Sequence, residues 1–179
     1  MPILKIAKFG HPVLIKKAKI IKNLPDISIE NLAKNMIETM LDADGLGLAG
    51  PQVHINKQII VFRVPQIEKT EEKNQTIEIT VLINPKLTKI SKETENDWEG
   101  CLSIPRMSGL VKRFAKIEYE GLDMKGNIIK REAEGLHARI VQHEYDHLMG
   151  VLYLNRLADP RAFGFTEEIE KHWKQKNEE

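Results

Sequence analysis

The segment QHEYDHLMG, residues 142–150, contains two histidines four positions apart. In a helix, His143 and His147 lie on one face, one turn apart, and can bind a single metal ion. Glu144 then lies beside the ion, where its carboxylate can accept a proton from metal-coordinated water. The alternative is a surface helix that happens to carry charged residues. The spacing therefore favours a hydrolytic metal site on a helix, whose third protein ligand comes from elsewhere in the chain.

The residues around this segment continue the helical pattern. Apolar side chains recur at helical spacing, and Gly150 is the residue type at which such a helix commonly ends. We therefore predict a helix with one face towards the core. Its apolar side consists of Leu136, Ile140, Val141, Tyr145 and Leu148.

Length and composition predict one domain over residues 1–179, because 41% hydrophobic residues suffice for a sizeable core. A net charge of +1, from 27 basic and 26 acidic residues, indicates no direct nucleic-acid site and no membrane surface. The N-terminus leads into no apolar run of signal-peptide or membrane-span length, so we expect a cytoplasmic protein. The single cysteine, Cys101, cannot form an internal disulfide, which is typical of a reducing compartment.

Two further helices and a strand-rich middle are expected. One helix begins at Asp26 and stops near residues 44–45, and another covers 166–173. Residues 1–24 are expected to form an extended arm with a turn at 10–12, and the polar residues 66–75 a solvated excursion. Between the helices, short runs separated by turn residues predict strands, most clearly the β-branched run at 58–64. These lie at 58–64, 77–83, 86–90 after a break at 84–85, 110–114, 116–122 and 128–133, with a turn at 123–127.

The segment GLGLAGPQ, residues 45–52, is expected to be a shaped loop because it has three glycines within six positions and then a proline. It lacks the Lys-Ser/Thr of a phosphate-binding loop, and no strand precedes it as a dinucleotide fingerprint requires. Nucleotide binding is therefore excluded. Glycine also allows another backbone to approach closely, as when a peptide ligand runs alongside the loop.

Four residues are candidates for the third metal ligand. His137 is six positions before His143 and points away from the ligands, so we expect it to be exposed or behind them. Asp146 projects off the ligand face and more plausibly holds an arginine or caps a loop. His54 has no spacing argument in its favour. Cys101, in the bend WEGCLSIP at 98–105, is either a ligand or a buried hydrophobe, and spacing leaves both open.

Three segments together resemble the motifs of peptide deformylases, in the family's order: GLGLAGPQ at 45–52, EGCLS at 99–103 and QHEYDHLMG at 142–150. The resemblance implies an α+β fold, with short antiparallel strands wrapped around a central metal-binding helix, an N-terminal helix and a C-terminal helix. It implies an enzyme that removes the formyl group from the formyl-methionine of new polypeptides and releases formate. Its partners would be N-formyl-methionyl nascent peptides, in association with the ribosome.

The resemblance also implies the roles of individual residues. Cys101, His143 and His147 would bind one divalent metal ion, natively Fe²⁺, with Zn²⁺, Ni²⁺ or Co²⁺ in its place in some preparations. Glu144 would accept the proton from the attacking water. The backbone N–H of Leu102 and the side-chain amide of Gln52 would stabilise the oxyanion. Spacing alone does not identify the metal, since Cys and His suit both zinc and iron.

The same resemblance implies how the peptide binds. It would lie extended along Gly45, Leu46 and Gly47, pairing backbone to backbone. Leu46, Leu136 and Ile140 would surround the methionine side chain, although each is equally consistent with core packing.

Two further positions matched to the family, Glu99 and Arg113, would form a supporting ion pair. Two departures from the family pattern concern the loop and the peptide. Gly50 replaces the usual alanine, which loosens the loop without removing a reacting group. Ser108 stands where many members have an arginine that holds the far end of the peptide; Arg106 is a candidate substitute, and weaker peptide binding is the alternative.

Three other classes of protein compete with this interpretation. A zinc endopeptidase of the His-Glu-x-x-His type would usually take its third ligand after the helix, whereas the suitable cysteine here precedes it. A structural metal module would normally have four protein ligands. An inactive relative that only binds peptide N-termini is disfavoured by the intact Glu144.

Overall fold

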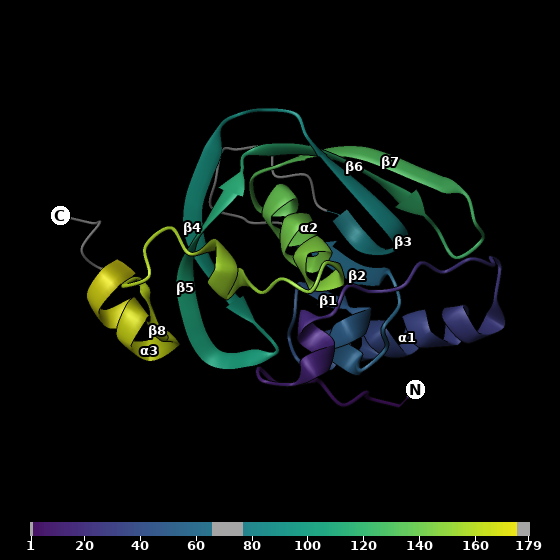
Figure 1. Ribbon diagram of the computed structural model, residues 1–179, viewed down its shortest axis with the longest axis horizontal. Coiled ribbons are helices and arrows are strands. Elements are labelled where there is room, and N and C mark those ends of the chain that lie inside the picture. Colours follow the sequence, from purple (N-terminus) through teal and green to yellow (C-terminus); the bar gives the residue numbers. More distant parts are fainter. Residues whose placement is uncertain (1, 66–76, 175–179) are drawn as a thin grey trace.

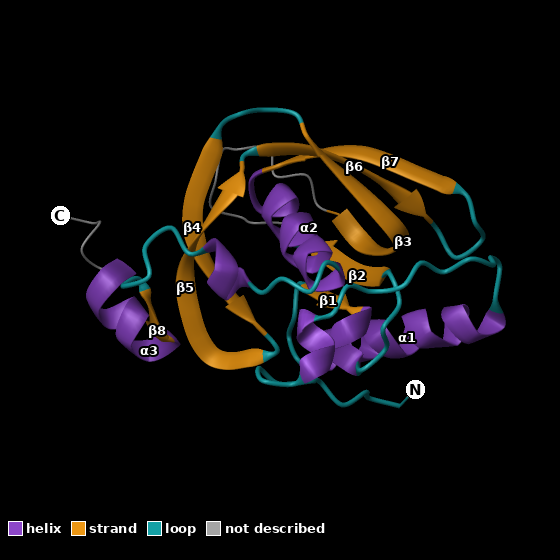
Figure 2. Ribbon diagram, viewed as in Figure 1, coloured by secondary structure: helices purple, strands orange, loops and turns teal. Residues whose placement is uncertain are grey.

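The computed structural model describes residues 2–65 and 77–174 and contains two antiparallel sheets with a helix between them (Figures 1 and 2). The first sheet has the strand order β1-β2-β3-β6-β7 and the second the order β4-β5-β8. The strands are β1 (Gly47–Ala49), β2 (Ile59–Val64), β3 (Ile77–Lys89), β4 (Thr94–Cys101), β5 (Ile104–Phe114), β6 (Lys116–Leu122), β7 (Ile128–Glu134) and β8 (Phe163–Phe165). The helices are α1 (Ile27–Asp42), α2 (Gly135–Leu148) and α3 (Thr166–Ile169), the last continued by a π-helical turn, Glu170–Lys174.

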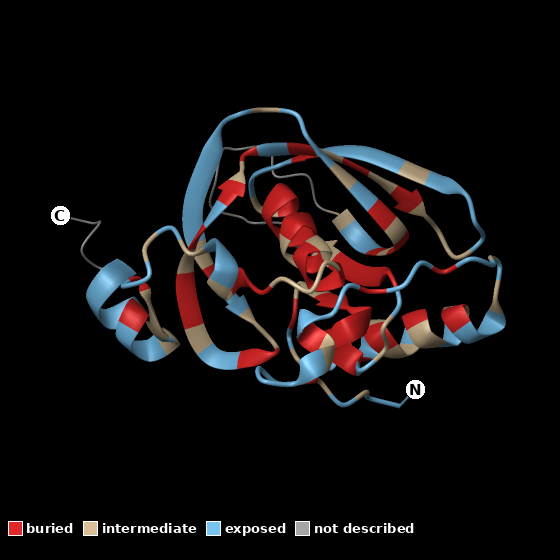
Figure 3. Ribbon diagram, in the orientation of Figure 1, coloured by how far each residue is buried: buried red, intermediate tan, exposed pale blue. Residues whose placement is uncertain are grey.

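Helix α2 is the centre of the fold, and strands from both sheets contact it (Figure 1). Ten of its fourteen residues are buried, so the prediction of a single core-facing side understates its burial (Figure 3). The buried set includes the polar Gln142, Glu144, Asp146 and His147 as well as the apolar residues. A central helix requires partners for polar groups on every side. The expected α+β class, with antiparallel strands around a central helix, is confirmed.

Helix α1 forms as the sequence predicts. The Asp26 side chain accepts a hydrogen bond from the backbone N–H of Ser28 at 2.7 Å and caps the first turn. The stripe of apolar residues faces the sheet, with Ile29, Met36 and Met40 fully buried. The helix ends at Asp42, two residues before Asp44 adopts a left-handed backbone conformation with φ 49°.

The structure corrects two expectations about strands. Strand β3 runs through Asn84 and Pro85 instead of breaking there, because Asn84 adopts φ 49° and the pairing with β6 shifts register between Ile83 and Lys86. The Asn84 amide also bonds the backbone of Ile21 in the N-terminal arm, donating to its carbonyl at 2.8 Å and accepting from its N–H at 2.9 Å. Residues 94–97 were not among the predicted strands, but β4 begins at Thr94. Its hydrogen bonds to β5 hold it extended although its first four residues are exposed.

The glycine segment is more regular than the expected loop. Gly47–Ala49 forms β1, the edge strand of the first sheet, paired with β2 in the register Gly47↔Phe62. A 3-10 turn, Gly50–Val53, follows. Strands β2, β6 and β7 lie close to their expected ranges, and residues 166–174 are helical as expected. Strand β5 begins at Ile104 instead of residue 110, so the expected bend at 98–105 is reduced to residues 102–103 between β4 and β5. Strand β8 was not predicted. The polar excursion at 66–75 lies outside the described residues, and across 2–65 and 77–174 the structure has no helix long and apolar enough to cross a membrane.

Candidate metal centre and peptide cleft

Cys101, His143 and His147 come together at the centre of the molecule. Cys101 is the last residue of β4, where the pairing with β5 shifts register, and the two histidines lie one turn apart on α2. The Sγ of Cys101 is 3.3 Å from Nε2 of His147, and one ligand atom from each of the three residues lies within 4.8 Å of the others. A thiol and two imidazole nitrogens in this geometry form a donor set that suits Zn²⁺ or Fe²⁺.

The electrostatics of the cluster favour ligation by Cys101. Burial by itself would raise the pKa of the thiol, but the adjacent His147 and His143 rings outweigh burial and hold that pKa well below its ordinary value. The thiolate is the form of cysteine that binds metals. Among the described residues, buried Oε2 of Glu144 and Nδ1 of His147 have no hydrogen-bond partner. Nδ1 of His147 lies on the side of the ring away from Cys101, whereas the unpaired Glu144 oxygen beside three converging donors fits a metal ion with coordinated water.

The other three candidate ligands have different partners. Asp146 accepts hydrogen bonds from Arg113 and, at 3.0 Å, from Nη2 of Arg156, so the expectation that it holds an arginine is confirmed. His54 packs edge-on against His11 with ring centroids 4.7 Å apart. His137 was expected to be exposed or to lie behind the ligands; it is buried and lies 3.1 Å from the hydroxyl of Tyr119, so the first alternative is wrong.

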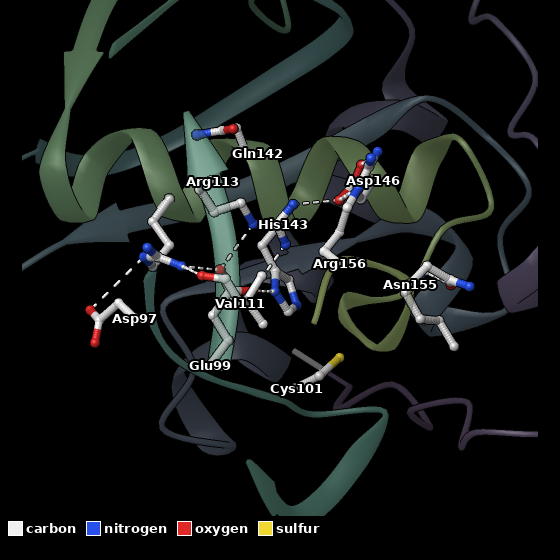
Figure 4. Close-up of polar contacts among 12 residues, drawn as sticks. Asp97, Glu99, Cys101, Val111, Arg113, Gln142, His143, Asp146, Asn155 and Arg156 are labelled. Carbon is white, nitrogen blue, oxygen red and sulfur yellow. Dashed lines mark hydrogen bonds and ion pairs between the residues drawn. The ribbon is translucent and has the colours of Figure 1, made fainter. Parts of the chain in front are cut away.

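His143 is oriented by a buried chain of charges that begins at Glu99 (Figure 4). Nδ1 of His143 lies 2.9 Å from Oε2 of Glu99, which leaves Nε2 to face the cluster. Arg113 binds both oxygens of Glu99 at 2.9 Å and also pairs with Asp146, which confirms the expected Glu99–Arg113 pair. Arg139 adds a contact of 2.8 Å to Glu99. This network holds the imidazole ring of His143 in a fixed orientation through the ring nitrogen that faces away from the metal-ligand cluster.

Glu144 is 4% exposed and lies against the glycine segment. Burial, opposed by His143 and His147 and reinforced by Cys101 and Glu99, raises the pKa of its carboxyl to about 7. A Cβ at Gly47 would lie 2.3 Å from Oε1 of Glu144. Gly47 is therefore needed for the close approach of the carboxylate to β1, a specific reason for glycine at this position.

Gln52 and Leu102 lie beside the cluster. Oε1 of Gln52 accepts from the backbone N–H of Ala49 at 2.8 Å, and its Nε2 points to Sγ of Cys101 at 3.6 Å and to Oγ of Ser103 at 3.2 Å. The amide is thus held with its donor side towards the metal-ligand candidates. Leu102 follows Cys101 directly and lines a cleft that opens beside the cluster.

A cleft of about 590 Å³ leads from the cluster to the surface. Gly45, Leu46 and Gly47 line one side, and Leu136 and Ile140 of α2 line its floor, together with Glu144 and His143. All five candidate peptide-binding residues therefore border one cavity. The opposite side is formed by β4 and β5, including Trp98, Gly100, Arg106, Met107 and Ser108, and by Thr166 at the start of α3.

Sequence reasoning missed Arg139, Trp98 and Thr166. Arg139 lies four residues before His143, so helical spacing could have placed it on the same face of α2. Trp98 directly precedes the second motif, and a large aromatic side chain two residues before Gly100 was the available signal. Thr166 reaches the cleft only through the pairing of β8 with β5, for which the sequence offers no local indication.

Comparisons with known proteins agree with this geometry. The model of the polypeptide deformylase family matches residues 3–162. Peptide deformylase 1 of Nitrosomonas europaea is 42% identical over 164 residues, which cover 92% of this chain and 93% of the relative. Peptide deformylase 1 of Bordetella pertussis has the same identity and the same coverage of both chains.

Solved structures give the same result. The crystal structure of peptide deformylase from Thermotoga maritima has a TM-score of 0.78 at 35% identity and covers 89% of this chain and 100% of that chain. A Met-Ala-Ser-bound class I type b peptide deformylase from Acinetobacter baumannii has a TM-score of 0.80 at 33% identity. The match covers 87% of this chain and 99% of that chain.

Proposed function

The chain belongs to the polypeptide deformylase family, enzymes that act on N-formyl-methionyl peptides, and we propose that it does so with one divalent metal ion bound by Cys101, His143 and His147. The observation that carries the proposal is the convergence of these three donors beside the unpaired carboxylate of Glu144. We propose Fe²⁺ as the native ion on the basis of the family resemblance, with Zn²⁺, Ni²⁺ and Co²⁺ as ions that the same donors accept.

A divalent ion held by the Cys101 thiolate and the neutral imidazoles of His143 and His147 would keep a net charge of +1, which would lower the pKa of a coordinated water and polarise the formyl carbonyl. Glu144 lies where it can accept the proton of the attacking water as the new C–O bond forms. It then delivers this proton to the departing amine when the C–N bond breaks, and formate leaves. Glu144 therefore returns to its starting state after each turnover.

The oxyanion formed on the formyl carbon requires hydrogen-bond donors. We assign this role to the side-chain amide of Gln52, whose orientation is fixed by its bond to Ala49, and to the backbone N–H of Leu102. Removal of one such donor typically lowers the rate about a hundredfold or more. Nε2 of Gln52 also contacts Oγ of Ser103. A Gln52→Glu substitution would replace this donor nitrogen by a carboxylate oxygen, which only accepts hydrogen bonds.

The substrate peptide would extend along β1. Gly47 begins this strand, and Gly45 and Leu46 precede it. The strand is the edge of the first sheet, so its side that faces the cleft is open to another extended chain. Leu46, Leu136 and Ile140 would then surround the methionine side chain. Backbone pairing makes recognition largely independent of the residues that follow methionine. The Met-Ala-Ser-bound relative from Acinetobacter supports the binding of a peptide at least three residues long.

A paired variant experiment tests the proposed roles. Protein purified without oxygen and loaded with ferrous iron should release formate from formyl-Met-Ala-Ser. Glu144→Ala should keep one metal ion per chain and lose turnover, whereas Glu38→Ala, on the exposed face of α1, should leave both unchanged. Loss of metal by Glu144→Ala would contradict its role as a proton acceptor. Cleavage of casein without deformylation would instead favour an endopeptidase.

A further inference from the structure

The C-terminal segment forms part of the cleft wall. Strand β8 pairs with β5 in the register Met107↔Phe165, and Oγ of Ser108 lies 2.8 Å from Oγ1 of Thr166. Ile169 of α3 is 3% exposed and anchors the helix against the second sheet. Figure 1 shows α3 beside β5 and β8, away from the central helix α2. The segment is therefore fixed at the mouth of the cleft by pairing, a hydrogen bond and apolar burial.

Trp98 and Trp173 connect this segment to the cleft. Trp98 lines the cleft, and its ring packs edge-to-face against Trp173, with centroids 6.1 Å apart and an angle of 74°. Trp173 is 40% exposed and lies one turn after Ile169. Trp98 thus has the substrate cleft on one side and the C-terminal segment on the other.

The space next to Trp98 is open. Side chains alternate along a strand, so Trp98 and Gly100 share one face of β4. In the described part of the chain, the atom nearest to a Cβ at Gly100 would be the carbonyl oxygen of Met107, at 3.7 Å. A side chain of a bound peptide therefore has room beside the Trp98 ring.

We propose that Trp173 is a positioning residue, which holds Trp98 in place so that its ring contacts an apolar side chain of the peptide downstream of methionine. The inference rests on the proposed function, because deformylation would place the formyl group of the peptide at the metal site beside Cys101. Trp98 is three residues before Cys101 on β4, a separation of about 10 Å at the rise of a strand. An extended peptide has its second or third residue level with Trp98. Recognition along β1 uses the peptide backbone. The Trp98–Trp173 pair adds a preference for apolar side chains at the second or third peptide residue.

Kinetics with two peptides test the proposal. Trp173→Ala should raise the KM for formyl-Met-Leu-Leu about fivefold and leave kcat unchanged, because Trp98 loses its support but no reacting group moves. The KM for formyl-Met-Ser-Ser should change less than twofold. Trp173→Phe should restore the KM for the apolar peptide, since an aromatic ring still packs on Trp98. Lys171→Ala, an exposed change in the same helical turn, serves as the control.

An equal loss of activity on both peptides, with a lower melting temperature, would show that Trp173 is only structural and would overturn the proposal. An unchanged KM for formyl-Met-Leu-Leu in Trp173→Ala would do the same.

A spectroscopic measurement separates peptide binding from catalysis. The chain has two tryptophans, so Trp173→Phe leaves Trp98 as the single indole. Adding the unformylated peptide Met-Leu-Leu should change the emission of Trp98, and Met-Ser-Ser should change it much less. Emission that does not respond while formate is released would overturn this inference alone. Emission that responds in a protein without deformylase activity would overturn the proposed function and leave the peptide contact standing.

Discussion

Gly47→Ala should displace Glu144 without disturbing the metal ligands. The new Cβ would lie 2.3 Å from Oε1, 2.6 Å from Cδ and 2.7 Å from Cγ of Glu144, whereas unstrained contacts between such atoms lie at about 3.5 Å. The buried carboxylate must therefore move by about 1 Å. A misplacement of that size in a reacting group costs about a hundredfold in rate, or about 3 kcal/mol of transition-state stabilisation.

The assay is formate release from formyl-Met-Ala-Ser, measured together with metal content. Gly47→Ala should lower kcat/KM about a hundredfold and retain one metal ion per chain. Gly164→Ala is the matched control, because its Cβ would meet Ile169 at an ordinary 3.7 Å. Combining Gly47→Ala with Glu144→Ala should cause no further loss beyond Glu144→Ala alone, since both changes act on one group. Activity of Gly47→Ala within threefold of the parent protein would refute the reasoning.

Three further changes probe the surroundings of the site. Arg113→Ala leaves Glu99 and Asp146 buried without their shared partner and should lower the free energy of unfolding by about 3–5 kcal/mol in urea titrations; a loss under 1 kcal/mol would contradict the network. Burial lowers the pKa of His137 to about 4, below its unfolded value of 6.5, so the folded protein should lose up to about 3 kcal/mol of stability as pH falls from 6.5 to 4. His137→Gln should remove this loss in urea titrations at the two pH values, and unchanged pH dependence would disprove the assignment. Cys101→Ser should weaken metal binding at least tenfold by competition with a chelator, while equal affinity would exclude the thiolate as a ligand.

Sequence patterns predicted the elements whose signals are local. Helix α1 has an apolar stripe and a capping Asp26, and the structure places it within two residues of the expected range. The hairpin of β6 and β7 follows from two short strand-like runs around the turn at 123–127. The convergence of Cys101 with two histidines of α2 was implied by a resemblance, because spacing alone left the cysteine undecided.

The features that sequence patterns missed depend on contacts between distant segments. The bulge at Asn84 is stabilised by Ile21, 63 residues away, so the local Asn-Pro signal suggested a break instead. His137 carries no sign in the sequence that Tyr119 buries it. The contact between Trp98 and Trp173 joins β4 to a helix 75 residues later. Tertiary packing decides such features, and local propensity does not encode it.

The most direct test of the central claim is a metal titration of the chelator-treated protein under anaerobic conditions, with formate release from formyl-Met-Ala-Ser as the readout. If Cys101, His143 and His147 bind the ion that the reaction needs, activity should be absent without metal. It should then rise with added ferrous iron to a plateau at one ion per chain. Full formate release by protein shown to contain no metal would contradict the account.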